Sequence, residues 1–126
     1  MAESNKPLLE AESKSTASAS WQELLKLKSD PNRKIYIDKI EISLHTYRPT
    51  TEVAIRVEIN GAPLMREFYP VVATTTLSFG RDLVFEGKTD KPPVLIKVES
   101  DGTTTVHATC IVTGIQTEYH KPPETE

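Results

Sequence analysis

Three histidines and one cysteine are the residues of this sequence best suited to metal binding or nucleophilic catalysis. His45, His107 and His120 lie far apart along the chain, and no His or Cys spacing matches the three or four converging ligands that a zinc site requires. Cys110 shares the alternating spacing of apolar residues such as Val112, which predicts a buried structural thiol rather than a nucleophile. We therefore expect no metal site here.

Acidic residues gather in two segments that could bring carboxylates together. Asp38 and Glu41 lie in the first, and Asp82, Glu86 and Asp90 lie in the second. Paired carboxylates hydrolyse glycosides when a cleft holds them roughly 5 to 9 Å apart, but basic residues neighbour both groups and favour solvated ion pairs. The five glycines are scattered singly, so no phosphate-binding loop is present. We predict no enzymatic activity, no catalytic residue and no cofactor.

Aromatic side chains are the residues most able to bind a ligand or a partner. Tyr36 lies on the strand face opposite its apolar neighbours, and Phe68 and Tyr69 come just before a proline. An exposed ring can stack on a sugar, or it can cover a sheet face or a subunit interface. We name Trp21, Tyr36, Phe68 and Tyr69 as partner-binding residues, with both interpretations open.

The elements that must position these side chains are strands, because the dominant period of the sequence is two. Apolar residues alternate with polar ones from Val53 to Ile59, and Asn60-Gly61 follows directly. This dipeptide favours a two-residue hairpin turn, since both central positions need positive φ. The pattern predicts an antiparallel pair whose return strand ends before Pro70. Within it Val57 faces the core and Glu58 faces solvent.

A second alternating run predicts a second hairpin. Val94, Ile96 and Val98 alternate with polar or exposed positions, and Asp101-Gly102 then forms a turn signal of the same kind. The return strand extends from residue 103 to about residue 117, with the apolar face on even positions from Val106. We expect these two strands to pair with each other.

The remaining runs complete an all-β pattern of about eight strands. In residues 34–45 the apolar positions switch parity between Asp38 and Lys39, which indicates a β-bulge or a strand that bends between sheets. Residues 74–85 add β-branched runs interrupted by Gly80. Residues 21–28 suit either a first strand or a short helix, and we favour the strand. The predicted fold is an antiparallel β-sandwich that resembles a jelly roll.

The chain of 126 residues is long enough for one domain, which we place at residues 21–117. Residues 1–20 are small and polar and predict a disordered N-terminal arm, and residues 118–126, with paired prolines, predict a flexible tail. The net charge of −3 lies wholly in the two ends, −1 over residues 1–20 and −2 over residues 117–126. Two interpretations of these ends stay open: unstructured chain, or arms that order on a partner.

Composition also limits the classes of partner. A net negative charge and a pI of about 5.7 argue against nucleic-acid or anionic-membrane binding, and no apolar run is long enough to cross a bilayer. The first residues lack the apolar stretch of a secretory signal, and a single cysteine excludes an intrachain disulfide. We expect synthesis and assembly in a reducing cytoplasm.

The strand series resembles a known class of protein. The segments Lys34–Ile42, Val57–Gly61, Leu77–Gly87, Val94–Val98 and Val106–Gly114 look like small β-sandwich virion proteins of tailed bacteriophages, of the capsid-decoration or head-fibre type. The resemblance implies a structural protein that binds the major capsid protein or another virion component on the outside of a phage head. It also implies a homo-oligomer, for which a trimer is the expectation, located in the virion. It transfers no catalytic or ligand residue.

A second function of a different class stays open beside it. The same sandwich could be a carbohydrate-binding or receptor-binding module of a tail or fibre, with exposed aromatic rings as the stacking platform.

Overall fold

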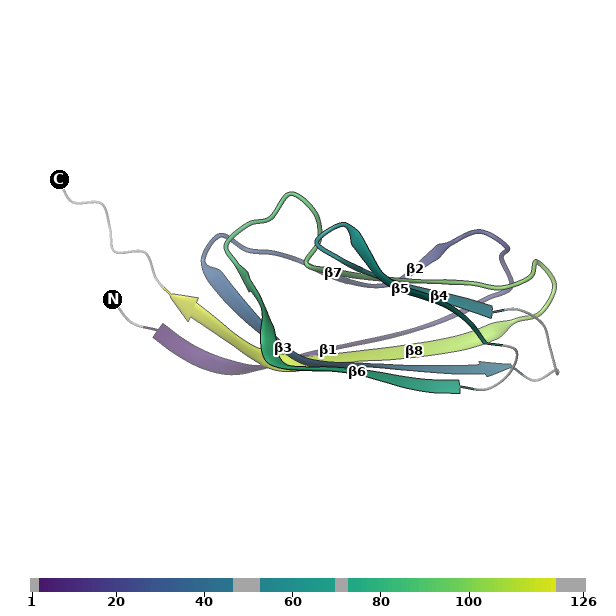
Figure 1. Ribbon diagram of the computed structural model, residues 1–126, viewed down its shortest axis with the longest axis horizontal. Helices are drawn as coiled ribbons and strands as arrows, with labels where there is room; N and C mark the ends of the chain where they lie inside the picture. Colours follow the sequence, from purple (N-terminus) through teal and green to yellow (C-terminus); the bar gives the residue numbers. More distant parts are fainter. Residues whose placement is uncertain (1–2, 47–52, 70–72, 120–126) are drawn as a thin grey trace.

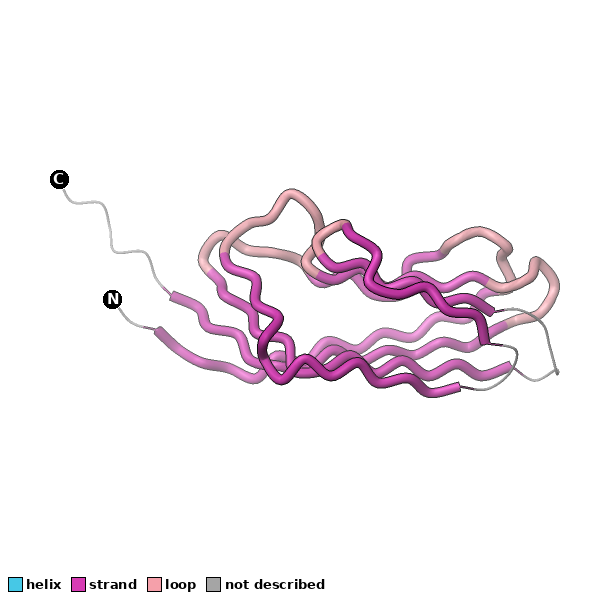
Figure 2. The backbone as a smooth tube through the Cα atoms, in the orientation of Figure 1, coloured by secondary structure: helices cyan, strands magenta, loops and turns pink. Residues whose placement is uncertain are grey.

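The computed structural model describes residues 3–46, 53–69 and 73–119, and the side chains of residues 3–4, 62–69, 73–75 and 119 lie outside that description. The described chain forms eight strands and confirms the all-β prediction (Figures 1 and 2). The strands are β1 (Glu3–Thr16), β2 (Gln22–Leu27), β3 (Arg33–Thr46), β4 (Val53–Ile59), β5 (Ala62–Tyr69), β6 (Ala73–Glu86), β7 (Val94–Glu99) and β8 (Val106–Tyr119).

Two four-stranded antiparallel sheets face each other, with strand orders β1-β8-β3-β6 and β2-β7-β4-β5. This arrangement is a jelly roll. The pairs β1–β8, β2–β7, β3–β6 and β4–β5 are those of one long hairpin whose tip is the β4–β5 turn. When that hairpin rolls up, the additional pairs β3–β8 and β4–β7 close the two sheets. The predicted jelly-roll sandwich is confirmed.

The Asn60-Gly61 turn at the tip of this hairpin is confirmed. Asn60 and Gly61 have φ values of 50° and 85°, so both adopt the left-handed conformation that a two-residue turn requires. Gly61 has a second constraint, because a Cβ atom there would lie 2.8 Å from Cγ of Lys91. Both positions of this turn therefore favour residues that readily adopt positive φ, and position 61 also favours a residue without a side chain.

The second predicted hairpin is wrong. β7 and β8 lie in different sheets, so the loop at Asp101-Gly102 crosses from one sheet to the other. The Asp101 carboxylate accepts hydrogen bonds from the backbone N–H groups of Thr103, at 2.8 Å, and Thr104, at 2.6 Å. A side chain that satisfies its own loop in this way stabilises a turn without pairing the strands on either side.

The disordered arm predicted for residues 1–20 is also wrong over residues 3–16. These residues form β1, which pairs with β8 at fourteen consecutive positions from Glu3–Tyr119 to Thr16–Val106. Backbone hydrogen bonds to β8 supply the stabilisation that its small polar side chains do not, and Leu8 is buried. The sandwich accordingly begins at residue 3 and ends at Tyr119, and residues 120–126 of the predicted tail lie outside the described residues.

The parity switch in β3 is confirmed as a bulge that bends the larger sheet. Between the Ile37–Leu83 and Lys39–Ser78 pairs, β3 contributes only Asp38 whereas β6 contributes residues 79–82. Gly80 and Arg81 have φ values of 58° and 70°, and Figure 1 shows β6 turning sharply in this region. The switch in the sequence therefore predicts the place where the end of this sheet changes direction.

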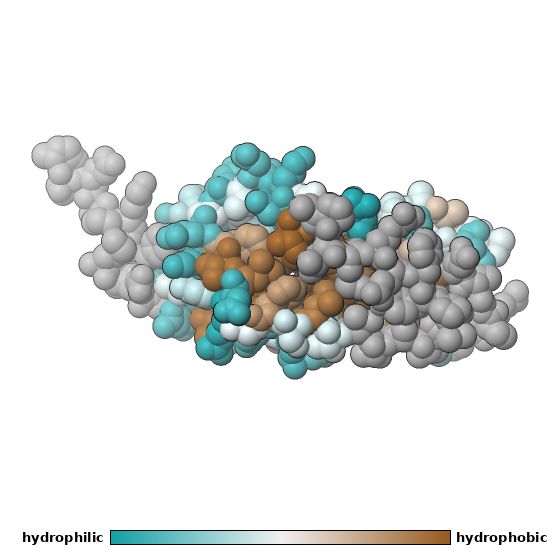
Figure 3. Space-filling view, viewed as in Figure 1, coloured by the Kyte–Doolittle hydropathy of each residue, from teal (hydrophilic) through white to brown (hydrophobic). Residues whose placement is uncertain are grey.

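The core consists of the inner faces of the two sheets. The alternating residues predicted to face inward are buried, among them Val57, Ile96, Val98, Cys110 and Val112. The predicted strand over residues 21–28 is confirmed as β2. Figure 3 shows hydrophobic side chains gathered on the side where β6 and β5 are the edge strands. Leu77, Phe79 and Leu83 of β6 are partly exposed hydrophobic residues that pack against the core.

Candidate functional site

Two neighbouring cross-strand rows on the outer face of the β1-β8-β3-β6 sheet build a hollow. The apolar row runs across the four strands through Pro7, Ile115, Tyr36 and Val84. The polar row, one step nearer the end of the sheet, runs through Asn5, Thr117, Lys34 and Glu86. The hollow between them measures about 420 Å³, and we call it the Tyr36 hollow; its lining residues are Asn5, Lys34, Tyr36, Arg81, Glu86, Ile115 and Thr117.

The bulge positions this hollow, because both rows lie in the part of the sheet beyond the bend. Arg81, which lies in the four-residue insertion of β6, reaches the hollow, and its Nε lies 3.5 Å from Oδ2 of Asp38 in the bulge of β3. Gly114 of β8 lies opposite the same bulge, where a Cβ atom would lie 1.9 Å from the carbonyl oxygen of Tyr36. Only glycine permits the strands to approach this closely behind Tyr36.

Polar contacts inside the hollow hold its side chains in place. The Lys34 ammonium lies 5.3 Å from the centre of the Tyr36 ring, at cation–π distance. The Thr117 hydroxyl donates a hydrogen bond of 2.7 Å to Oδ1 of Asn5, which ties β8 to β1. A ligand that stacks on the covered face of the Tyr36 ring must displace the ammonium, and a ligand with a negative group could instead recruit it.

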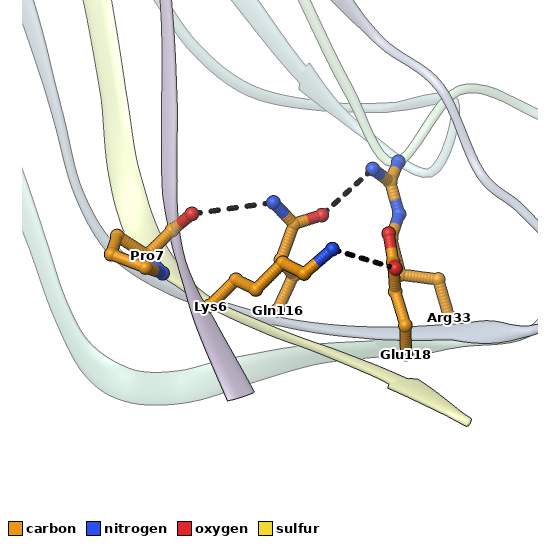
Figure 4. A network of polar contacts seen from close by, with 5 residues as sticks. All are labelled: Lys6, Pro7, Arg33, Gln116 and Glu118. Carbon is orange, nitrogen blue, oxygen red and sulfur yellow. Dashed lines mark hydrogen bonds and ion pairs between the residues drawn. The ribbon is translucent and has the colours of Figure 1, made fainter. Parts of the chain in front are cut away.

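A hydrogen-bonded network supports the same end of the sheet from its inner face (Figure 4). Nη1 of Arg33 donates to Oε1 of Gln116 at 2.9 Å, and Nε2 of Gln116 donates to the Pro7 carbonyl at 3.2 Å. Lys6 and Glu118 form an ion pair of 3.1 Å beside them. These contacts join β1, β8 and β3 at the end of the larger sheet that the second sheet does not cover. They hold together the three strands on whose outer face the Tyr36 hollow lies.

The chemistry available in the Tyr36 hollow is that of binding. An aromatic ring and an aliphatic side chain provide apolar contact, and an amide, a hydroxyl, two cations and a carboxylate provide polar contact. Such a set suits a sugar ring or the side chain of a partner protein. Within the described ranges no three His, Cys, Asp or Glu side chains lie close enough together to hold a metal ion, and no helix is long and apolar enough to span a membrane.

Of the four aromatic residues predicted to bind a partner, the structure places Tyr36 in the hollow and does not bring Trp21 to it. Trp21 is half-buried just before β2, in the other sheet. Phe68 and Tyr69 lie in β5, and their side chains lie outside the described part of the structure. Trp21 and Tyr36 therefore do not share one site, and the prediction that these four residues bind a partner stays a prediction.

His45, His107 and Cys110 occupy the positions that the strand pattern predicts, and His120 lies outside the described residues. His45 and His107 are cross-strand neighbours whose ring centres lie 6.2 Å apart, and Ser15 Oγ lies 2.6 Å from Nδ1 of His107. Cys110 is fully buried, and burial raises the pKa of its thiol to about 12. A thiol with this pKa is protonated at neutral pH, in keeping with a structural role.

Glu58 differs from its prediction as a simple solvent-facing residue. Its Oε2 lies 2.7 Å from Nε of Arg56 and 3.3 Å from Nζ of Lys97, and its side chain is only 12% exposed. Burial by itself raises the pKa of this carboxyl, but the hydrogen bonds from Arg56 and Lys97 outweigh it and leave the pKa below its usual value. Glu58 therefore joins β4 to β7 on the outer face of the smaller sheet.

The sequence pattern did not indicate the other lining residues of the Tyr36 hollow, because strand register brings them together. Lys34, Glu86 and Thr117 share a row with Asn5 only through the strand register, and no local motif reports register between distant strands. Asn5 was assigned to a tail. The parity switch in β3 is the signal that could have found the site, since it marks where the sheet bends and thus where a hollow can form.

Comparison with known proteins shows the fold but no family. No known protein family and no curated protein matches the sequence. Among solved structures, a protein of the disulfide-linked pili that form Bacillus endospore appendages aligns with a TM-score of 0.54 at 7% identity, over 93% of this chain and 92% of that chain. A chain of the nora virus structure aligns with a TM-score of 0.52 at 12% identity, over 99% of this chain and 64% of that chain.

A third solved structure is the decameric BFDV capsid protein. It aligns with a TM-score of 0.50 at 8% identity, over 93% of this chain and 100% of that chain. At such identities the likeness concerns the fold alone. This chain therefore resembles in fold the BFDV capsid protein, a chain of the nora virus structure and a protein of endospore-appendage pili.

Proposed function

We propose that this chain is a structural subunit of a virus particle, and more specifically a decoration protein that binds the outer surface of a phage head. The observation that carries the proposal is the jelly-roll fold, in which this chain aligns with a chain of the nora virus structure, the BFDV capsid protein and an endospore-appendage protein. In this role its partner is the major capsid protein or another component of the virion. Fold-level likeness supports the proposal as an analogy.

The surface supports a role in assembly. The apolar row crosses an outer sheet face, where alternation normally leaves polar side chains, and its Val84 is 39% exposed. Leu9 of β1, in the row next to it, is 64% exposed. The partly exposed β6 residues Leu77, Phe79 and Leu83 extend the apolar surface around the edge of the sheet. Apolar surface grouped in this way marks contacts between proteins.

We further propose that the chain forms a closed homo-oligomer, with three copies as the expectation. β1 and β6 are edge strands of fourteen residues each. Long edges promote uncontrolled pairing unless they are covered or charged, and a closed ring of subunits covers them.

Light scattering during size-exclusion chromatography tests the oligomer. We expect the native chain to elute with the mass of three copies and Val84→Glu to elute with a lower mass, because a charge in the apolar row opposes its burial. Thr105→Glu is the matched control, since Thr105 is exposed in the loop before β8, outside the apolar row and outside both edge strands. A monomeric native chain, or equal masses for Val84→Glu and the native chain, would overturn the proposed interface.

Co-sedimentation tests the role on the virion. We expect the chain to sediment with undecorated heads of the virus that encodes it, and to remain in the supernatant without heads. Absence of sedimentation with heads, tails or their isolated proteins would rule out the decoration role.

The Tyr36 hollow favours a second function, carbohydrate or receptor binding by a module of a tail or fibre. A ring beside polar groups in a hollow of about 420 Å³ is the geometry that suits one sugar unit. On a glycan array we expect any bound glycan to be lost in Tyr36→Ala and retained in Trp21→Ala, because Trp21 lies away from the hollow. Binding that survives Tyr36→Ala would reject the hollow as the sugar site.

A further inference from the structure

A second hollow, at the loops that join β2 to β3 and β6 to β7, is lined mainly by lysines. It measures about 320 Å³, and we call it the lysine hollow; its lining residues are Lys26, Lys28, Ser29, Lys88, Thr89, Asp90, Lys91 and Pro92. The loop between β6 and β7 forms the rim, and Figure 3 shows hydrophilic side chains over it at the top of the view. Of the aromatic and carboxylate residues singled out from the sequence, only Asp90 lines this hollow.

The charges of this hollow are unbalanced. Its four lysines and one aspartate give a local charge of +3. Among the described residues no carboxylate lies within ion-pair distance of any of these four lysines, whereas Lys6, Lys39 and Lys97 elsewhere each have a glutamate partner. Like charges gathered without counterions oppose folding slightly, so their grouping needs a compensating interaction.

Arg33 adds to the positive charge beside the hollow. Its Nη2 donates a hydrogen bond of 2.6 Å to the carbonyl of Lys28, and its Nη1 donates to the Gln116 side chain, so both acceptors are neutral. The arginine therefore holds the Lys28 backbone in place without neutralising the lysines.

Hydrogen bonds between three loops hold in place the backbone segments that carry the lysines. The Thr89 N–H donates to Oγ of Ser29 at 3.1 Å, and the Asn60 N–H donates to the Pro93 carbonyl at 3.0 Å. The stem of Lys91 occupies the space that a side chain at Gly61 would need. Because these loops are ordered before binding, less of the interaction energy is lost in ordering them when a ligand binds.

We propose that the lysine hollow binds the phosphodiester backbone of a linear polyanion. Lysine ammonium groups are point charges that neutralise phosphates without reading sequence. The cores of protein interfaces are depleted in lysine, and only Pro92 in this lining is apolar, so an acidic protein surface fits the hollow less well. The lining holds no aromatic ring on which a base or a sugar could stack.

The net charge of −3 excludes a basic protein, but the lysine hollow at one end of the sandwich has a positive local charge. The phosphodiester chain could come from a nucleic acid or from a surface polymer of alcohol phosphates. The chemistry recognised is the same, and the inference does not depend on a virion role.

Fluorescence anisotropy with labelled polymers tests the proposal. The probes are a single-stranded oligothymidylate of roughly 20 nucleotides, an abasic strand of equal length and poly(glycerol phosphate). We expect all three to bind with similar affinity, with log affinity falling against log salt at a slope of about −2 to −3, as three or four neutralised phosphates predict. Equal binding of all three probes would show that the hollow recognises the phosphodiester backbone alone. A preference for one of these polymers, compared at equal charge, would identify whether the ligand is a nucleic acid or a polymer of alcohol phosphates.

Charge reversal provides the matched test of location. We expect the double variant Lys28→Glu/Lys88→Glu to lose at least tenfold in affinity. The control, Lys6→Glu/Lys39→Glu, makes the same change in net charge at two lysines that do not line the hollow and should lose less than threefold. Melting curves of both variants confirm that each is folded at the temperature of the assay.

Four results would overturn the proposal. The first is absence of binding to any phosphodiester polymer at low salt, and the second is binding to the oligothymidylate but not to the abasic strand. The third is an equal loss of affinity in the control variant. The fourth is binding of poly-L-glutamate or heparin tighter than any phosphodiester polymer, which would assign the hollow to an acidic protein or a sulfated polysaccharide instead.

Discussion

At position 114 of β8, the absence of a side chain lets the bulged segment of β3 lie against the neighbouring strand. An added Cβ atom would lie 1.9 Å from a backbone oxygen of Tyr36, which cannot move without disturbing the sheet. We expect Gly114→Ala to lower the free energy of unfolding by about 3 kcal/mol or more, measured by urea denaturation. The variant should also perturb the Tyr36 hollow, since the clash lies directly behind it.

Gly80→Ala separates this steric effect from the general cost of replacing glycine. Gly80 has a φ of 58°, and an added Cβ atom there meets nothing within 4 Å. Its replacement should cost about 1 kcal/mol from backbone conformation alone. Equal losses for the two variants would show that close packing at Gly114 is unimportant.

The Asp101 carboxylate makes stability depend on pH. Hydrogen bonds from the backbone N–H groups of Thr104 and Thr103, and then from their hydroxyls, hold the pKa of Asp101 well below its usual value. A carboxyl with a lowered folded-state pKa contributes stability that is fully present above the unfolded-state pKa, about 4, and is lost as pH falls towards the folded value. Glu58 acts in the same direction.

Urea denaturation between about pH 5 and pH 2.5 checks this dependence. We expect the free energy of unfolding of the native chain to fall as pH is lowered, and Asp101→Asn to show a shallower fall, because the amide does not titrate. Parallel curves for the two proteins would mean that this loop is not a source of the acid sensitivity.

Among the elements, β1 turns from an expected arm into a structural strand, which changes what truncation should do. Removing residues 1–19 exposes the edge of β8 and the core around Leu8, whose burial alone contributes about 2 kcal/mol. We expect the melting temperature to fall by about 10 °C, measured by circular dichroism. Leu9→Ala is the control and should leave it nearly unchanged, because Leu9 is 64% exposed. An unchanged melting temperature in the truncated chain would support the prediction that residues 1–20 form a disordered arm.

The elements show which parts of the fold a single sequence can predict. Alternation identified the strands that bury one face, such as Val53–Ile59, because the buried face leaves a period of two. β1 left no such trace, since only Leu8 among its described residues is buried and backbone pairing holds the rest. The Asp101-Gly102 turn was recognised as a turn, but turn residues do not specify which sheet the next strand joins.

The candidate sites were predictable to a smaller extent for the same reason. Tyr36 could be placed on an outer face by parity, and the bulge that positions it could be placed between Asp38 and Lys39. Its partners come from β1, β8 and β6, and the register that brings them into one row is a property of the rolled sheet. The lysine hollow likewise joins Lys26 and Lys28 to Lys88 and Lys91 across sixty residues of sequence.

At the scale of the whole molecule, Cys110 reports on opening of the sandwich. Burial raises the pKa of its thiol to about 12, and the side chain is fully buried. We expect Ellman's reagent at pH 8 to react about a thousandfold more slowly with the native chain than with the urea-unfolded chain, and the rate to rise with urea in parallel with unfolding. Rapid labelling without urea would show that β8 detaches locally from its neighbours.

The whole molecule also explains why its net charge was a poor guide. Ion pairs such as Glu58 with Arg56 and Lys97 neutralise charge within the sheets, while the lysine hollow concentrates it at one end. A sandwich whose net charge is −2 over residues 3–119 therefore still presents a positive end, which is a property that an oriented attachment to a surface requires.

The nesting of the strand pairs around the Asn60-Gly61 tip has a consequence for how the chain is made. The innermost pair, β4–β5, can form as soon as the middle of the chain leaves the ribosome, but β1, synthesised first, has its partner β8 among the last residues to emerge. Until β8 has been synthesised, the fourteen residues of β1 have no β8 strand to pair with. Polar side chains along β1, with charged residues at Glu10, Glu12 and Lys14, keep that waiting strand soluble and discourage it from pairing with nascent copies on the same messenger.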